Sequence, residues 1–480
     1  MSLPNVEPAD VFRYFRSICR IPHGSGNERE LTEYILRFAR ERGLWAVRDG
    51  SLNVIVKKPA SSGRANSPAL LLQCHMDMVC EKNSGKVFDF TKDPVEIVMD
   101  GDTIKSNGTT LGADNGLGVA MMLAVLGAKD IPHPPLEAVF TAEEEIGLVG
   151  ATAMDMSALK ARRMINLDTG GEGTFVVSCA GGLRVGVHLP VRQTDADASG
   201  SGYEIWVKGL KGGHSGGDID KERGNANVIL GRALYRLAAE PDFRLRLASL
   251  EGGEKENAIP REACAHIVTD GDPSRIVAEL KRTFTKEYHA TEPHLDLFIG
   301  KKELPPKVYD EASRDRIIQS LLTLPHGVVH RMNSEGGWSV ETSNNLATVS
   351  ARDENVRIVC AIRSNVASRK YALLDRIRIV TGLLGGTIEP GAEYPAWEYA
   401  ADSPLRTAAA KVYEELRGAA PEIKVTHGGL ECGLFAERIP GLDIISFGPS
   451  IYDAHTPDEW FSISSLSRTW EFFKALLASL

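Results

Sequence analysis

The stretch LEAVFTAEEEIGLVG, residues 136–150, places an apolar run directly before three consecutive glutamates. The run Leu136–Thr141 has the apolar content and length of a buried β-strand. Crowding the like charges of Glu143, Glu144 and Glu145 costs electrostatic energy unless water or a cation lies nearby. The stretch therefore predicts a buried strand whose carboxyl end meets either water or bound positive charge.

Neighbouring segments repeat the strand pattern and alternate with helices. Strands are predicted at 53–57, 69–73, 136–141 and 164–167, and helices at 28–42 and for about fifteen residues from Asn115. Ser25 and Glu28 have the spacing of a capping box at the start of the first helix. This alternation indicates a mostly parallel sheet with helices on both faces, and ligands of such sheets bind beyond the carboxyl ends of the strands.

The pattern changes after about residue 184. Strands near 203–208, 258–269 and 355–361 alternate with helices near 225–239, 273–289 and 369–384, and twice the order suggests a split βαβ unit. From residue 397 the chain returns to helix, strand, strand and helix. We therefore predict an α/β protein whose mostly parallel domain, residues 1–184 and 397–480, is interrupted by an inserted α+β lid domain of split βαβ sandwich type, residues 185–396.

The composition argues against several classes of protein. The 480 residues include 55 lysines and arginines and 64 aspartates and glutamates, for a net charge of -9. This balance predicts no nucleic-acid partner and no membrane partner. The longest apolar run, 119–128, is too short to span a bilayer, and the first residues lack the apolar core of a signal peptide. Seven scattered cysteines fit a reducing cytoplasm and not a disulfide framework.

Carboxylates and imidazoles follow several of the predicted strands. His75 and Asp77 come just past the second strand, Asp168 follows the fourth, Asp114 lies at a helix start, and His455 lies in a late loop. Each alone has an ordinary explanation, as a hydrogen-bonded pair, a turn residue, a helix N-cap or a solvated histidine. Together with the glutamates they converge on one edge of a parallel sheet. Such a set of nitrogen and oxygen donors is typical of a centre for two metal ions and suits zinc, manganese or cobalt.

Seven short motifs carry a resemblance to a known family. They are HMDMV, GADNG, TAEEEIG, NLDTGG, GGHSG, HGGLECG and DAHTPDE, in this order along nearly the whole chain. The set resembles the co-catalytic zinc peptidases, the family that includes aminoacylase, carboxypeptidase G, dipeptidase V and the aminoacyl-histidine dipeptidases. The resemblance implies that the mostly parallel domain is a zinc-peptidase catalytic domain and that the inserted domain is its lid.

The resemblance also implies two sets of zinc ligands. One ion would be held by His75, Asp114 and Asp168. The second would be held by Asp114, Glu145 and His455, so that Asp114 bridges the two ions. Manganese or cobalt would be the substitutes for zinc.

The same resemblance implies the residues that act on the attacking water. Glu144 would be the general base, because it is the first glutamate of the family's Glu-Glu-x-Gly pattern. Since three glutamates are adjacent, a register shifted by one residue would select Glu143 instead. Asp77 would orient His75, and the peptide bond between Asp114 and Asn115 would be cis.

Further positions offer contacts to a substrate. His214 lies in a glycine-rich loop, and the family places this histidine on the oxyanion of the scissile carbonyl, from a second subunit or subdomain. Arg363, at a strand end, is suited to hold a terminal carboxylate by a bidentate pair. Asn345 stands where relatives have a substrate-contacting asparagine, and Gly428 and Gly429 look like a backbone-amide site for a carboxylate. A turn histidine and a solvated arginine are the ordinary alternatives for His214 and Arg363.

The resemblance implies a cytoplasmic, metal-dependent enzyme, a homodimer, that hydrolyses unblocked dipeptides, among them Xaa-His substrates such as β-alanyl-histidine. A broad di- or tripeptidase or an aminoacylase of the same family would share the metal centre and differ in the lid. From another class, a catalytically inactive binding protein on this scaffold is the alternative, and the complete set of ligands and base argues against it. A dinucleotide-binding protein is disfavoured because no G-x-G-x-x-G follows a first strand.

Overall fold

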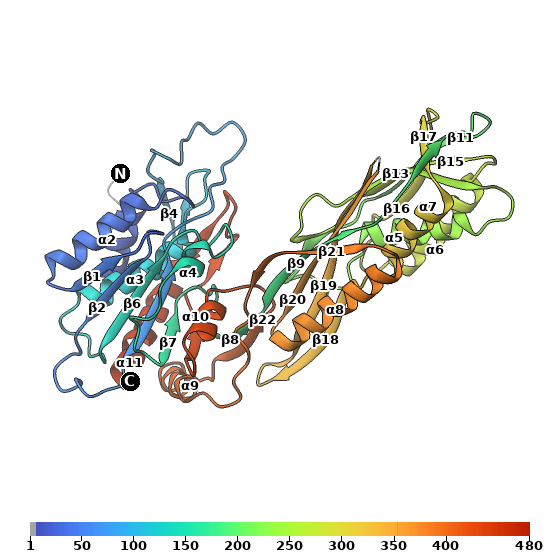
Figure 1. The fold of residues 1–480 in the computed structure, drawn as a ribbon. Helices are drawn as coiled ribbons and strands as arrows, with labels where there is room; N and C mark the ends of the chain where they lie inside the picture. The colour runs from blue at the N-terminus through green and yellow to red at the C-terminus, as the bar shows by residue number, and fades with distance from the viewer. Residues whose placement is uncertain (1–5, 353) are drawn as a thin grey trace.

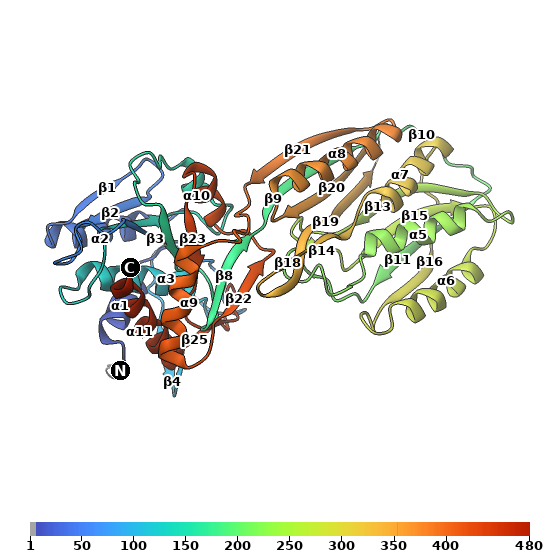
Figure 2. The same cartoon turned by 90° about the horizontal axis from the view of Figure 1, so that it is seen from below.

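The computed structural model describes residues 6–352 and 354–480 and consists of two sheet-based parts (Figure 1). The N-terminal segment, in blue and teal, and the C-terminal segment, in red, lie together in one part, and the green-to-orange middle of the chain forms the other. The view turned by 90° shows the same separation, with the chain passing between the parts from β8 (Thr174–Cys179) to β9 (Gly181–His188) (Figure 2). The molecule is therefore elongated, with its two ends in the same part.

The first part is built on an eight-stranded sheet in the order β1-β2-β6-β3-β7-β23-β8-β22. The central strands β6, β3, β7 and β23 run parallel, and antiparallel pairs occur elsewhere in the sheet. Apart from β8, the strands are Trp45–Arg48 (β1), Val54–Lys58 (β2), Leu70–His75 (β3), Leu136–Thr141 (β6), Arg163–Asn166 (β7), Glu422–Thr426 (β22) and Asp443–Ser446 (β23). The prediction of a mostly parallel sheet is confirmed, and the four strands predicted first all lie in it.

Alternate residues of these strands face two separate apolar layers. Leu70 and Leu72 of β3 belong to a core shared with five helices, whereas Leu71 packs with two short helices on the opposite face. The first set is Ala9–Ile18 (α1), Arg29–Glu41 (α2), Ala113–Gly127 (α3), Pro404–Arg417 (α9) and Ile463–Ser479 (α11), and the second is Val149–Ala153 (α4) and Cys432–Arg438 (α10). Because both faces are covered, every residue of β3 and β6 is buried, and functional side chains must come from beyond the strand ends.

The second part is a nine-stranded antiparallel sheet in the order β16-β11-β15-β13-β19-β20-β9-β21, with β18 beside β19. Besides β9, its strands are Ser201–Lys208 (β11), Leu245–Gly252 (β13), Ala263–Thr269 (β15), Asp296–Lys302 (β16), Gly327–Ser334 (β18), Gly337–Arg352 (β19), Asn355–Ser364 (β20) and Thr387–Tyr394 (β21). Helices Ala226–Ala238 (α5), Ser274–Glu287 (α6), Glu311–Thr323 (α7) and Ala367–Leu383 (α8) pack on it and form a second core.

Two split βαβ units make up this second sheet. One runs β11–α5–β13–β15–α6–β16 and the other β9–α7–β19–β20–α8–β21. In both, the strands lie in the order fourth, first, third, second across the sheet, which is the split βαβ arrangement. The first unit is inserted into the second, between β9 and α7, so the split βαβ prediction is confirmed. The division of the chain into domains at 184/185 and 396/397 stays a prediction.

Short strands complete the structure and position two loops. Ile97–Asp100 (β4), Thr103–Ser106 (β5), Ile451–Tyr452 (β24) and Trp460–Ser462 (β25) form a four-stranded sheet in the order β24-β25-β5-β4. Gly213–His214 (β12) pairs with Ala258–Ile259 (β14), and Gln193–Asp195 (β10) pairs with Lys307–Tyr309 (β17). The turn between β24 and β25 carries His455, and β12 itself contains His214.

Two local predictions are wrong. Ser25 does not cap α2, because the helix begins after Glu28 and the Ser25 hydroxyl instead donates to Asp77 (2.7 Å). The strand predicted at 258–269 is divided into β14 and β15, since Pro260 between them has no N–H group for a ladder. Both errors arise because local pattern does not reveal which partner a side chain or strand will meet.

Replacing Phe175 by alanine should destabilise the protein. Phe175 is 1% exposed on β8 and packs against the rings of Tyr413, Phe447 and Phe472. We expect Phe175→Ala to lower the free energy of unfolding by about 3–5 kcal/mol, measured by denaturant titration. Trp338→Ala is the matched control, because Trp338 is 72% exposed and its loss should change stability by about 0.5 kcal/mol or less. Equal effects of the two substitutions would contradict this packing.

Candidate metal centre

The carboxyl ends of β3, β6 and β7 lie side by side and present polar residues at one edge of the sheet. His75 is the last residue of β3 and is in register with Thr141, the last residue of β6. Glu144 and Glu145 follow β6, and Asp168 follows β7. Because the three strands are parallel, their side chains converge where the sequence predicted.

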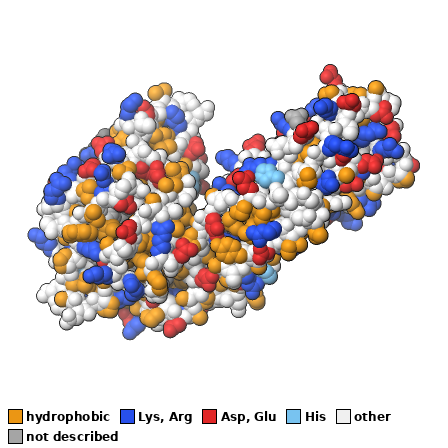
Figure 3. Space-filling model, in the orientation of Figure 1, with side chains coloured by type: hydrophobic (Ala, Val, Ile, Leu, Met, Phe, Trp, Pro, Cys, Tyr) orange, Lys and Arg blue, Asp and Glu red, His pale blue; other side chains and the backbone are white. Residues whose placement is uncertain are grey.

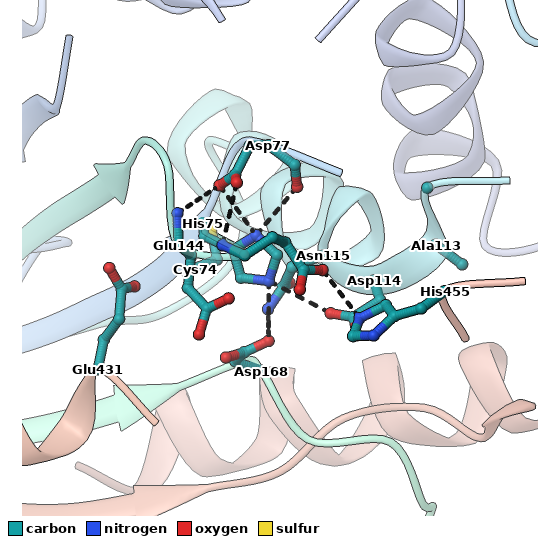
Figure 4. Close-up of polar contacts among 12 residues, drawn as sticks. Cys74, His75, Asp77, Ala113, Asp114, Asn115, Glu144, Asp168, Glu431 and His455 are labelled. Carbon is teal, nitrogen blue, oxygen red and sulfur yellow. Dashed lines mark hydrogen bonds and ion pairs between the residues drawn. The ribbon is translucent and has the colours of Figure 1, made fainter. Parts of the chain in front are cut away.

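Two triads of metal-type donors share one carboxylate at this edge (Figure 4). In the first, His75 Nε2 lies 3.3 Å from Asp114 Oδ1 and 3.2 Å from Asp168 Oδ1. In the second, His455 Nε2 lies 3.3 Å from Asp114 Oδ2 and 2.9 Å from Glu145 Oε1. The structure thus brings together all five residues predicted as ligands, with Asp114 between the two histidines. The Asp114–Asn115 peptide is cis, as predicted.

The electrostatics of the cluster favour a bound cation. Burial lowers the pKa of His75, but the charge of Asp168 and hydrogen bonds to Asp114 and Asp168 outweigh it and raise that pKa well above its usual value. Hydrogen bonds to Asp114 and Glu145 raise the pKa of His455 to about 11. Across residues 6–352 and 354–480, no lysine or arginine forms an ion pair with these carboxylates. Within the part of the chain that the structure describes, imidazoles are therefore the only ion-pair partners of these carboxylates, and divalent cations are the natural complement.

The donor set also fits a particular class of ion. Each triad contributes oxygens and one imidazole nitrogen, with ligand atoms within 4.8 Å of one another, and neither contains a thiolate. These hard and intermediate donors suit zinc, manganese or cobalt. A third possible group joins His75 with Glu144 and Glu145, so geometry alone leaves room for either glutamate as a ligand. Glu143 belongs to none of these groups.

Asp77 holds the glutamate segment as well as His75. Its Oδ1 accepts the backbone N–H of Glu144 (2.9 Å), and its Oδ2 accepts that of Glu145 (3.1 Å). Oδ1 also lies 3.4 Å from Nδ1 of His75, whose shorter contact is to the Asp77 carbonyl oxygen (3.0 Å). Burial opposes ionisation, but contacts with His75, the Glu144 amide and Ser25 hold the pKa of Asp77 at about 2. Asp77 therefore stays charged and fixes the turn after β6.

Glu459 holds the Asp114 segment, a function that sequence reasoning missed. Its carboxylate is 2% exposed and accepts four consecutive backbone N–H groups, from Leu111 (2.8 Å), Gly112 (3.0 Å), Ala113 (2.8 Å) and Asp114 (3.2 Å). Gly112 has a left-handed backbone (φ 72°), which favours glycine there. The one feature of the sequence that could have pointed to this function is an acidic residue four positions after His455. Its backbone partners, however, lie about 345 residues away in the chain.

Glu431 lies buried beneath the cluster and had no predicted role. Its Oε2 accepts hydrogen bonds from Thr141 Oγ1 (2.6 Å) and Gln73 Nε2 (2.5 Å), so it links the ends of β6 and β3. Burial raises the pKa of Glu431 to about 8. Figure 4 shows Glu431 to one side of the cluster formed by His75, Glu144 and Asp168. Glu431 is therefore a structural tie between the two strands that carry His75 and the glutamates.

The second part of the molecule contributes His214 and Arg363 from the same chain. Arg363 Nη2 lies 3.3 Å from His214 Nε2. The residues that line a cavity of about 600 Å³ include both Arg363 and Glu145. The cavity therefore borders one residue of the donor cluster, Glu145, and also the guanidinium that was predicted to hold a carboxylate.

The remaining predicted substrate contacts are less accessible. Asn345 is fully buried, and its Nδ2 donates to the carbonyl oxygen of Ala258 (2.7 Å), whose ladder partner is His214. The N–H of Gly428 donates to Thr426 Oγ1 (3.2 Å). A Cβ on Gly429 would lie 2.8 Å from the ring of Tyr394, so glycine is required by packing. Substrate contacts by these three residues stay predictions.

His427 connects the two parts of the molecule. Its Nε2 is 2.8 Å from Ser343 Oγ on β19, and its Nδ1 is 3.2 Å from Asn365 Oδ1 just after β20. Asn365 Nδ2 donates back to Ser178 Oγ on β8 (2.9 Å). Burial lowers the pKa of His427 to about 3, so the ring is neutral. This buried polar network fixes the lid strands against the parallel sheet.

The fold and the donor cluster together define a metallopeptidase, a hydrolase that acts on peptide bonds. Residues 71–479 match peptidase family M20/M25/M40, and the chain belongs to this family. It is 38% identical over 482 residues to the cytosol non-specific dipeptidase of Escherichia coli K12, covering 100% of this chain and 99% of that protein. The relationship to a cytosol enzyme supports the predicted cytoplasmic location.

Solved structures show the same architecture. The crystal structure of aminoacylhistidine dipeptidase from Vibrio alginolyticus aligns with a TM-score of 0.90 and 38% identity, over 99% of this chain and 97% of that one. Aminopeptidase PepT from Bacillus cereus shares the fold, with a TM-score of 0.57 and 17% identity. In the described part of the chain, no helix has the length and apolar character needed to cross a membrane. All seven cysteines are free thiols in this structure.

Removing the Glu459 carboxylate should loosen the Asp114 segment. Glu459→Ala leaves four buried N–H groups without their acceptor, so we expect the free energy of unfolding to fall by about 1–3 kcal/mol. We also expect faster loss of metal during dialysis against a chelator, measured by elemental analysis. Asp458→Ala is the matched control, because Asp458 is exposed. Unchanged stability and metal retention in Glu459→Ala would show that this clamp has no influence on Asp114.

Proposed function

We propose that this chain hydrolyses unblocked dipeptides, with Xaa-His substrates such as β-alanyl-histidine among them, at a centre of two zinc ions. The observation that carries the proposal is the pair of donor triads sharing Asp114, one member of which, Glu145, lines the same cavity as Arg363. The full-length relationship to two dipeptidases supports the substrate class.

We assign the ligands as the sequence predicted. His75, Asp114 and Asp168 hold one ion, and Asp114, Glu145 and His455 hold the other. When bound, such ions acidify water and polarise a carbonyl oxygen. The amides fixed by Asp77 and Glu459 keep the ligand-bearing turns in place, so the ligands need little rearrangement to bind.

We assign Glu144 as the general base. Its backbone is held by Asp77, and burial raises the pKa of its carboxyl group well above the usual value, which suits a group that must accept and return a proton near neutral pH. Glu144 lies outside the two triads that share Asp114. It therefore remains free to take a proton from the attacking water and deliver it to the leaving amine.

We assign Arg363 as the anchor for the C-terminal carboxylate of the substrate. The side chain is 9% exposed, and its Nη1 donates to the hydroxyl of Tyr394 (2.9 Å), which fixes the guanidinium at the cavity wall. A guanidinium held in this way recognises a carboxylate by charge and by directed N–H groups. The predicted homodimer rests on the family resemblance, and pairing His214 with Arg363 does not require a partner subunit.

Broad dipeptidase specificity is a second candidate, because the Escherichia coli relative is described as non-specific. An aminoacylase and an inactive binding protein are the further alternatives. Each of these alternatives predicts a different set of hydrolysed substrates. A defined substrate panel therefore distinguishes them.

The proposal is tested by metal analysis together with a substrate panel. Purified enzyme should hold two divalent ions per chain and hydrolyse β-alanyl-histidine and Gly-His, and chelation followed by zinc should abolish and restore this activity. Equal rates on Gly-Leu would favour broad specificity. Hydrolysis of N-acetyl-histidine without hydrolysis of dipeptides would identify an aminoacylase, and no hydrolysis by the metal-loaded protein would identify a binding protein.

Exchanging single glutamates tests the identity of the base. Glu144→Gln should retain both metal ions and lose activity by roughly 10²–10⁴-fold, because the amide cannot accept the proton of the attacking water. Glu143→Gln is the matched neighbour and should keep near-normal kcat/KM. The reverse result would mean that the register is shifted by one residue, and loss of metal from Glu144→Gln would make Glu144 a ligand.

A further inference from the structure

Ser25 and Glu28, the predicted capping-box residues, contact the turn after β6 instead of capping α2. The Ser25 hydroxyl donates to Asp77 Oδ2 (2.7 Å), and Glu28 Oε1 accepts the backbone N–H of Glu143 (3.0 Å). Glu28 comes directly before α2 and is fully buried. A buried carboxyl group therefore contacts the first of the three adjacent glutamates through its backbone.

Three consecutive amides of the glutamate turn, residues 143–145, are held by two buried carboxyl groups. Glu28 accepts the N–H of Glu143, and Asp77 accepts those of Glu144 (2.9 Å) and Glu145 (3.1 Å). Since three identical side chains follow one another here, the backbone conformation determines which of them points toward a given place. The two carboxyl groups therefore fix the backbone from which all three glutamate side chains project.

Glu143 has a backbone conformation that needs such support. Its φ of 52° lies in the left-handed region, which residues other than glycine seldom adopt without stabilising contacts. Its N–H is held by Glu28, and its carbonyl oxygen accepts the N–H of Val149, the first residue of α4 (3.0 Å). Because the conformation of residue 143 sets the direction in which the chain continues, it also sets the position of the Glu144 side chain.

The loop that carries Glu28 is attached to the same segment as Asp77. Glu28 Oε1 accepts a second backbone N–H, that of Gly26 (3.0 Å), whose φ of 83° favours glycine. Two residues earlier, Gly24 forms an isolated parallel bridge with Met78, the residue after Asp77. The two carboxyl groups are therefore fixed relative to each other.

We propose that Glu28 is a positioning residue for the general base: by holding the amide of Glu143, it makes Glu144, and neither neighbouring glutamate, the base. The inference rests on the proposed function and deepens it. Glu28 acts through the backbone of the turn, so its contribution is the placement of the Glu144 carboxyl group and not contact with the substrate. A displacement of about 1 Å in such a group can reduce the rate on the order of 100-fold.

An acceptor atom at Oε1, and not a negative charge, is what Glu28 supplies to the turn. Among the residues that the structure describes, Oε2 of Glu28 has no hydrogen-bond partner. Burial raises the pKa of Glu28, which favours its neutral form. Glu28→Gln keeps the acceptor without the charge, whereas Glu28→Asp keeps the carboxyl group but is one methylene shorter, which withdraws the acceptor from the Glu143 N–H. The two substitutions therefore separate the hydrogen bond from the charge.

The first test compares these two substitutions in the metal-loaded enzyme, with β-alanyl-histidine as substrate. Glu28→Gln should keep kcat within about twofold of wild type, and Glu28→Asp should lower kcat about 10- to 100-fold at nearly unchanged KM and metal content. Glu30→Asp is the matched control and should behave as wild type, because Glu30 is exposed in the same segment. Loss of kcat in Glu28→Gln, or a normal kcat in Glu28→Asp, would each overturn the inference.

A double-substitution cycle separates positioning from a general loss of stability. In an enzyme that already carries Glu144→Gln, Glu28→Asp should change the remaining kcat by less than about twofold, because the group that Glu28 positions is gone. A residue that only supports the fold would lower kcat by the same factor in both backgrounds. That result would show that Glu28 does not act through Glu144.

The position of the turn gives a readout that needs no turnover. A crystal structure of metal-loaded Glu28→Asp should show residues 143 and 144 displaced while the two donor triads keep their positions, and that of Glu28→Gln should superimpose on wild type. An unchanged turn in Glu28→Asp would contradict the inference even in an active enzyme. If wild type hydrolyses no dipeptide, the proposed function fails, whereas the displacement of the turn still tests whether Glu28 holds it.

Discussion

Electrostatic repulsion among carboxylates at the end of a parallel sheet is the constraint on which the rest of this structure depends. Asp114, Glu144, Glu145 and Asp168 meet at one edge. Within residues 6–352 and 354–480, the ion pairs formed by Asp114, Glu145 and Asp168 are to the rings of His75 and His455. Such an arrangement persists in a folded protein when divalent cations supply the balancing charge. This clustering requires a parallel sheet, because only parallel strands bring the carboxyl ends of β3, β6 and β7 to the same edge.

A second set of buried carboxylates positions the metal-type donors. Asp77 and Glu459 accept backbone N–H groups of the turns that carry Glu144, Glu145 and Asp114, and Glu431 joins β3 to β6. Each has several hydrogen-bond donors, which is what makes a buried acid tolerable in an apolar interior. The apolar layers on both faces of the sheet stabilise the fold and so hold this polar region in place.

The topology of the lid likewise positions polar side chains that are distant in the chain. One split βαβ unit is inserted in another, so one nine-stranded sheet carries Arg363 on β20, and the separate two-stranded sheet of β12 and β14 carries His214 beside it. On the face of the lid shown in Figure 3, lysine and arginine side chains are interspersed with aspartate and glutamate side chains. The network of His427, Ser343 and Asn365 then holds this sheet against the catalytic part.

The sequence alone determined the class of fold and the members of the cluster of metal-type donors. Periodicity located the strands from 53–57 to 164–167, and the motifs named His75, Asp114, Glu145, Asp168 and His455, because residue type and position at a strand end are local properties. Tertiary structure decided what depends on partners distant in the chain: the contacts of Glu459 and Glu431, the burial of Asn345, the failure of Ser25 as a cap, and the pairing of His214 with Arg363 within one chain. A carboxylate that serves a backbone 345 residues away leaves no local pattern, since a hydrogen bond is set by distance and direction in space.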